Sequence, residues 1–180
     1  MPHFSLTYRL TGAGWAEAHV SDGVTTLRLD VSYIGDGIEA AAWAAIALLQ
    51  NAEHAKFEWL DEPRWWGEGS GLSYWVLDKQ GTQLQITVLS GWSFDDQGGK
   101  VRDVLLSVGT TPLKFAIQVW DALRQLKEEH GVEGYHQQWR RAFPLESYQQ
   151  LEDLIRVAKR AARATRSAQG KRSHHKQANT

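Results

Sequence analysis

The chain has 180 residues, 42% of them hydrophobic and 23% charged, so we expect one packed domain rather than a disordered polypeptide. It contains nine tryptophans and no cysteine, which excludes disulfides, thiolate metal sites and a cysteine nucleophile. The N-terminal sequence shows no signal peptide, and no apolar run approaches the roughly 18 residues that span a bilayer. We therefore expect a cytoplasmic protein without a membrane partner.

The net charge of −1 conceals an uneven distribution along the chain. No acidic residue follows Asp153, whereas eight basic residues do: Arg156, Lys159, Arg160, Arg163, Arg166, Lys171, Arg172 and Lys176. The rest of the chain holds the other 12 basic residues and all 21 acidic ones, a net charge of −9. An acidic body with a basic tail bears on the binding partners of the protein and not on its fold.

The first third of the chain predicts strands and one helix. Apolar and polar residues alternate over 4–10 and again over 27–33, the period of a half-buried strand, and "SDG" at 21–23 predicts a hairpin turn. Asp36 and Glu39 have the spacing of a capping box, which predicts the start of a helix near Asp36. An apolar stripe follows on that helix: Ile38, Ala42, Ile46 and Leu49.

Further strands are predicted over 54–59, in "LSYWVLD", in "QLQITVL" and in "KVRDVLLSV", with turns at "KQG" and at "DDQGG". Thr111 and Pro112 suit the N-cap and first turn of a helix that Gly131 would end. From Pro144 another helix is predicted to continue into the basic tail, with four residues facing inward: Leu145, Tyr148, Leu151 and Ile155.

These elements predict an α+β fold: an antiparallel meander sheet of about seven strands with one inserted helix and two or three C-terminal helices. Residues 1–155 are expected to form a single domain. Residues 156–180 are expected to form a basic helical extension with a disordered end.

The tryptophans fall into two groups. Trp43, Trp59 and Trp120 lie on or beside apolar faces and are predicted to be core or half-buried. Trp65 and Trp66 lie in "DEPRWWGEGSG", where no periodicity directs them inward, and adjacent residues of an extended segment face opposite sides. At most one of these two is expected to be buried, and the other is a candidate anchor for a protein partner. The predicted binding site adds three acidic residues around the pair: Asp61, Glu62 and Glu68.

The basic tail is the second candidate site. Five residues recur at intervals of three and four and would form one stripe on a helix that could follow a phosphate backbone: Arg156, Lys159, Arg160, Arg163 and Arg166. No aromatic residue is interleaved, which disfavours stacking on single-stranded nucleic acid. The alternative is a tail that is solvated or that docks on the acidic body.

Motifs for catalysis are lacking from the sequence. No histidine pair has metal-ligand spacing, no serine lies in GxSxG and no phosphate-binding loop occurs. The carboxylates at 58, 61, 62 and 68 lie beside aromatics as in glycoside hydrolases, but acidic loop residues are usually solvated. We therefore expect no catalytic residue, no metal and no cofactor, although a carboxylate-pair enzyme remains a third hypothesis.

Several segments carry a family resemblance: "GWAEAHVSDG", the helix after it, "FEWLDEP" and "GYHQQWRRAFPL". They resemble small bacterial proteins of the WapI-like kind, which are similar to immunity proteins of polymorphic toxin systems. The resemblance covers roughly residues 4–155, excludes the basic tail and carries no active-site residues with it. It implies a non-enzymatic protein-binding domain that inhibits a toxin, and an acidic body would speed its encounter with a basic toxin. The alternative prediction is a protein that binds nucleic acid through its C-terminal helix.

Overall fold

The computed structural model describes residues 3–35, 37–63, 70–91 and 101–177; of residues 61–63, 70–71, 91, 101–102 and 165–177 it describes the backbone alone. The order of elements is β1 (Ser5–Gly12), β2 (Trp15–Ser21), β3 (Thr26–Ser32), α1 (Ile38–Leu49), β4 (His54–Pro63), β5 (Ser70–Gln80), β6 (Gln83–Gly91), β7 (Val101–Thr110), α2 (Pro112–Trp139) and α3 (Leu145–Gln177). This order confirms the predicted α+β fold with seven strands, an inserted helix and two C-terminal helices.

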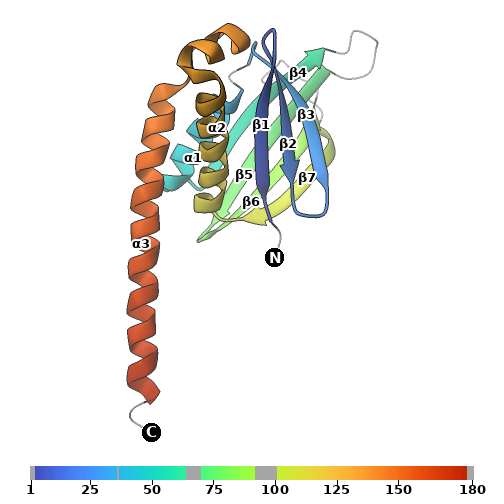
Figure 1. Cartoon of the computed structure of the whole chain (residues 1–180). Helices are drawn as coiled ribbons and strands as arrows, with labels where there is room; N and C mark the ends of the chain where they lie inside the picture. The colour runs from blue at the N-terminus through green and yellow to red at the C-terminus, as the bar shows by residue number, and fades with distance from the viewer. Residues whose placement is uncertain (1–2, 36, 64–69, 92–100, 178–180) are drawn as a thin grey trace.

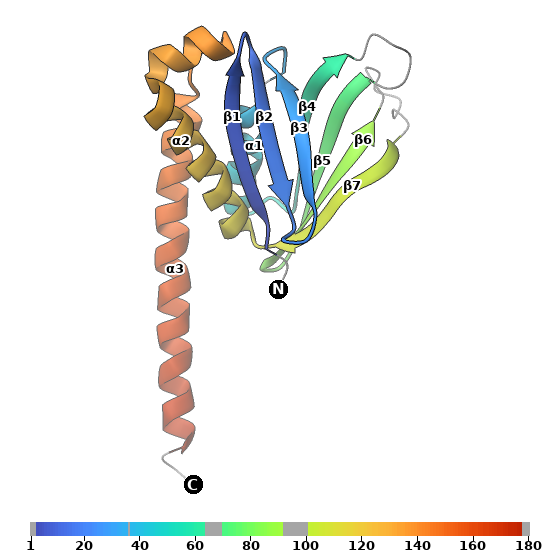
Figure 2. The ribbon, with the colours of Figure 1, turned by 45° about the vertical axis from the view of Figure 1, so that its right-hand side comes forward.

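The strands divide between two antiparallel sheets, with the orders β1-β2-β3 and β4-β5-β6-β7. The helix α1 connects the two sheets, and the C-terminal helices follow the last strand (Figure 1). The helix α2 packs against β1 and α1, and α3 packs against α1 and α2. Figure 1 shows the helices on the same side of the strands, and Figure 2 shows α3 continuing past the body as a long rod.

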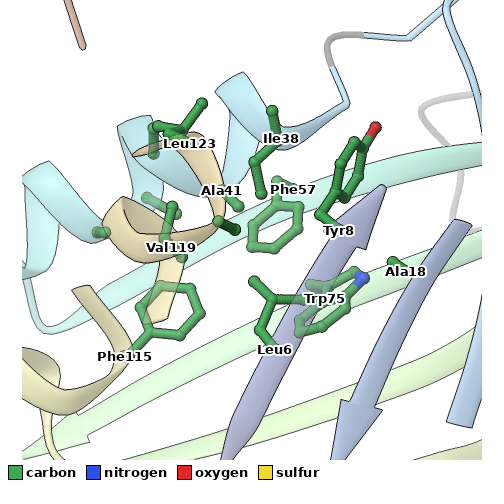
Figure 3. Packing of buried hydrophobic residues seen from close by; sticks show 14 of the residues in the cluster. Leu6, Tyr8, Ala18, Ile38, Ala41, Phe57, Trp75, Phe115, Val119 and Leu123 are labelled. Atoms are coloured by element: carbon green, nitrogen blue, oxygen red, sulfur yellow. The ribbon is translucent and has the colours of Figure 1, made fainter. Parts of the chain in front are cut away.

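One hydrophobic core joins the two sheets and the helices. The rings of Tyr8 on β1 and Trp59 on β4 lie 5.7 Å apart, and the rings of Trp59 and Trp75 lie 4.8 Å apart. The inner face of β2 carries the small residues Ala16 and Ala18, which leave space for these large rings. Figure 3 shows the aromatic side chains of the strands meeting apolar side chains of α1 and α2.

The start of α1 differs from the predicted capping box. Its N-cap is Gly37 rather than Asp36, and no side chain caps the helix. The backbone of Gly37 has φ 54°, and a Cβ there would lie 2.6 Å from Trp139 Cζ2. Close packing of this turn on α2 therefore selects a glycine, and the prediction of a capping box was wrong. Asp36 itself lies outside the described residues.

The C-terminal helices follow the prediction with two differences. Thr111 caps α2 by accepting a hydrogen bond from the Lys114 N–H at 3.2 Å, as expected. Gly131 has φ 66° and breaks the helix, but helical structure resumes beyond it because Tyr135 and Trp139 bury their rings. Leu145 was predicted to face inward, yet it is 40% exposed because Phe143 and Pro144 lie buried at the start of α3.

Candidate functional site

An open groove of about 710 Å³ lies between α1 and β4. One wall is the outward face of α1, which carries Trp43 and three alanines: Ala40, Ala44 and Ala47. The other wall is residues 55–58 of β4, with Leu60 and Tyr74 beside them. Its size falls in the range of roughly 300–1,000 Å³ that is common for ligand-binding sites.

Trp43 is the aromatic residue that the structure exposes at this groove, with 44% of its surface accessible. The prediction that it is core or half-buried was wrong, whereas Trp59 is buried and Trp120 is half-buried as predicted. The sequence contained a signal for the exposure of Trp43. Position 43 lies about 100° around the helix from Ala42, which is in the apolar stripe, so the stripe directs the indole away from the core.

The strand β4 is an edge of its sheet. The Lys79 N–H donates to the Glu53 carbonyl at 2.7 Å, and these two residues lie opposite each other in the register of β4 and β5. In an antiparallel ladder hydrogen-bonded pairs alternate, so residues 55, 57 and 59 direct their backbone groups toward β5. The backbone groups of residues 54, 56 and 58 therefore point away from β5, at the edge that borders the groove.

The charged side chains at the groove differ from those of the first sheet. Lys56 and Glu58 are exposed, and within the described residues neither has an ion-pair partner. By contrast, Glu17 on the first sheet is bound by Arg28 at 2.7 Å and by Arg9 at 3.2 Å. The charges of the first sheet are therefore satisfied within the protein, whereas the two at the groove are available to a ligand.

All five predicted protein-binding residues fall where side chains are not described. Asp61 and Glu62 are residues of β4, and the segment that contains Trp65, Trp66 and Glu68 connects β4 to β5. Trp65, Trp66 and Glu68 lie outside the described residues, as do the side chains of Asp61 and Glu62. The prediction that these five form a docking site therefore stays a prediction. It concerns the same strand, β4, that borders the groove.

The basic stripe lies on the part of α3 that extends past the body (Figure 1). Four of its side chains are exposed: Arg156, Lys159, Arg160 and Arg163. Arg156 forms an ion pair with Asp153 at 3.0 Å, and the side chain of Arg166 lies outside the description. Ile155 is the last buried residue of α3 among the side chains described. The stripe is therefore presented to solvent on a continuous helix.

Titratable side chains of the described residues were compared with the requirements of a metal site. They include no group of three or more His, Asp or Glu side chains that could hold a metal ion. Burial raises the pKa of Tyr8 and of Tyr135, so both phenols stay protonated within the core. Within the same residues, no helix combines the length and apolar character needed to cross a bilayer.

Comparisons of the chain with models of protein families, with characterised proteins and with solved structures gave no match. The resemblance to WapI-like immunity proteins therefore stays a prediction. The geometry of the groove and of α3 carries the functional argument.

Proposed function

We propose that this chain is a non-enzymatic protein-binding domain, an immunity-type inhibitor of a bacterial toxin, and that its partner docks at the groove between α1 and β4. The observation that carries the proposal is the exposed indole of Trp43 above an open groove. Tryptophan is enriched among the residues that dominate binding energy at protein interfaces, since it offers large apolar area together with a polar N–H.

The overall charge supports a basic partner. Residues 1–155 hold all 21 acidic residues against 12 basic ones. A net negative body accelerates the encounter with a positively charged protein, such as a toxin that acts on nucleic acid. The predicted acidic group at Asp61, Glu62 and Glu68 would add to this field near the end of β4.

Site-directed photocrosslinking tests the proposal. Trp43 is replaced by p-benzoylphenylalanine, and the matched control carries the same photoreactive residue at Arg28, which is exposed on the first sheet. We expect position 43 to yield one discrete protein adduct in the native host, identified by mass spectrometry as the product of a neighbouring toxin gene. Equal adducts at both positions, or a monomer without adducts at every concentration, would contradict the proposal.

The exposed stripe on α3 favours a second candidate function, binding of a nucleic-acid backbone. Four exposed cations at helical spacing can displace counterions from phosphates, which makes the affinity depend steeply on salt. We expect double-stranded DNA binding by the full chain to weaken linearly with the logarithm of salt concentration. Replacing both Arg160 and Arg163 by alanine should reduce that slope by about 2, whereas Val157→Ala should leave it unchanged. Binding that survives deletion of residues 156–180 would rule this function out.

A further inference from the structure

We propose that the groove binds its partner by strand addition: an extended segment of the partner lies between β4 and α1 and extends the sheet by one strand. This inference rests on the proposed function and specifies how the partner is held. The groove supplies three features that together select such a segment, and each follows from described residues.

The first feature is the row of backbone groups along β4. The N–H and C=O groups of residues 54, 56 and 58 point away from β5, as the register of the β4–β5 ladder requires. No strand hydrogen-bonds to this edge within the described residues, and β3, which packs against β4, does not line the groove. An unpaired strand edge is a template for another extended chain, and its main-chain hydrogen bonds supply affinity that does not depend on sequence.

The second feature is the wall that α1 forms opposite β4. Because Ala44 and Ala47 line that wall, a strand placed beside β4 has a helix on its other side. A strand that already belongs to a sheet would bring its neighbouring strand into this helix. The groove therefore suits a single extended segment, such as a chain terminus or a loop, rather than β4 of a second copy.

The third feature is the alternation of side chains along the edge. Lys56 and Glu58 point to the outer face of the sheet and have no ion-pair partner within the described residues. Residues directly opposite each other on neighbouring strands interact, so the bound segment is expected to carry an acidic residue beside Lys56 and a basic one beside Glu58. These two residues would lie two positions apart in the segment.

The inner face of the bound segment meets different chemistry. Its side chains would lie beside Phe57 and the alanines of α1, under the indole of Trp43. Alanine leaves space but offers no hydrogen bond, so small aliphatic residues fit there and charged ones do not. The structure thus assigns a partner segment with an acidic and a basic residue on one face and small aliphatic residues on the other.

The test uses the full chain and a phage library of linear eight-residue peptides as the probe. We expect the wild type to select peptides with an acidic and a basic residue two positions apart. Lys56→Glu should change the selection to two basic residues at that spacing. Failure of the wild type to enrich any peptide over the proline variant described next overturns the proposal.

Glu58→Pro and Glu58→Ala form a matched pair. Proline removes the N–H that faces the groove, and a proline is tolerated on the outer side of an edge strand because β5 does not use that N–H. Alanine removes the same carboxylate and keeps the N–H. We expect Kd for a selected peptide to rise at least tenfold with proline and less than threefold with alanine, while far-ultraviolet circular dichroism stays unchanged for both. Equal effects of the two variants contradict strand addition.

N-methylation of the peptide backbone, one position at a time, separates this inference from the proposed function. Strand addition predicts loss of binding at alternate positions, since every second N–H of the peptide pairs with β4. A flat response overturns strand addition. If position 43 still crosslinks to a host protein in that case, the proposed function stands and only the binding mode fails. If peptides bind with the alternating pattern but no host protein crosslinks, the proposed function fails.

Discussion

At the residue scale, Trp59 joins the two sheets to the start of α1. Its indole is buried between Tyr8 and Trp75, and its Nε1–H donates to the Gly37 carbonyl at 2.7 Å. This bond holds the turn at which the chain leaves the first sheet. The stability of this turn is therefore expected to depend on both the buried ring of Trp59 and its indole N–H.

We expect Trp59→Phe to lower the free energy of unfolding by at least about 1 kcal/mol more than Trp120→Phe. The first substitution removes a buried hydrogen bond and leaves space where the larger ring was. Trp120 is the matched control because its Nε1 is buried and has no partner within the described residues. Urea unfolding followed by tryptophan fluorescence provides the measurement, and an equal or larger loss for Trp120→Phe would contradict this reading.

The tryptophans also show how far residue-level prediction reaches. Trp59 alternates with polar neighbours on a strand, and period-2 alternation placed it correctly in the core. Trp43 was misplaced because the residues around it from Ala40 to Leu49 are all apolar, so its direction depends on the phase of a stripe built mainly of alanine and isoleucine. Whether a ring faces a groove or a packed neighbour depends on the element opposite, which local sequence does not specify.

At the element scale, the β2–β3 turn depends on one carboxylate. Asp22 Oδ1 accepts hydrogen bonds from the Thr25 N–H at 2.7 Å and the Val24 N–H at 2.8 Å. The Thr25 bond, followed by the Val24 bond, lowers the pKa of Asp22 below its ordinary value. A lowered pKa in the folded state means that the ionised form stabilises the fold.

We expect this contribution to be fully present above the ordinary pKa of about 3.9 and to be lost as the pH falls through the lowered pKa. Asp22→Asn keeps an acceptor oxygen at the same place and removes the charge. The wild type should therefore be more stable than this variant at pH 7, and the difference should shrink below about pH 4. Urea unfolding of both proteins across this range measures it, and a difference that stays constant with pH would argue against the assignment.

Most elements were predictable because each one carries its own local period. The segments predicted as strands correspond to strands of the structure, and Thr111 with Pro112 correctly predicted the start of α2. The division into two sheets was not predictable, since a pattern of alternating residues indicates which segments form strands but not whether β3 hydrogen-bonds to β4. The start of α1 was missed for a related reason: Gly37 is required by Trp139, a residue about a hundred positions away in sequence.

At the scale of the whole molecule, the structure combines one shared core with a helix that extends past it. Among the described residues, every buried hydrophobic residue of the two sheets and three helices except Leu72 belongs to one cluster, so the body is expected to unfold cooperatively. The described part of α3 beyond Ile155 buries no side chain. That segment has only local helical stability, which is marginal in water for an isolated helix.

We therefore expect two different thermal profiles from one sample. Tryptophan fluorescence should report a single sharp transition, whereas circular dichroism at 222 nm should also lose signal gradually below it. Deleting residues 159–180 should abolish the gradual phase and shift Tm by less than about 2 °C. Leu151→Ala, on the packed part of α3, should instead destabilise the body by about 2–5 kcal/mol. Coincident profiles in the full chain would show that the extension is held by contacts with the body.

The part of α3 that extends past the body also has a defined length. From Arg156 to Gln177 the helix advances about 33 Å at roughly 1.5 Å per residue, comparable to the width of a small domain. A polyanion on the far part of this rod and a polypeptide in the groove beside β4 would not compete for the same space, because no side chain described on α3 lines the groove. The two proposed binding sites therefore occupy separate parts of the molecule, and a ligand at one would leave the other accessible.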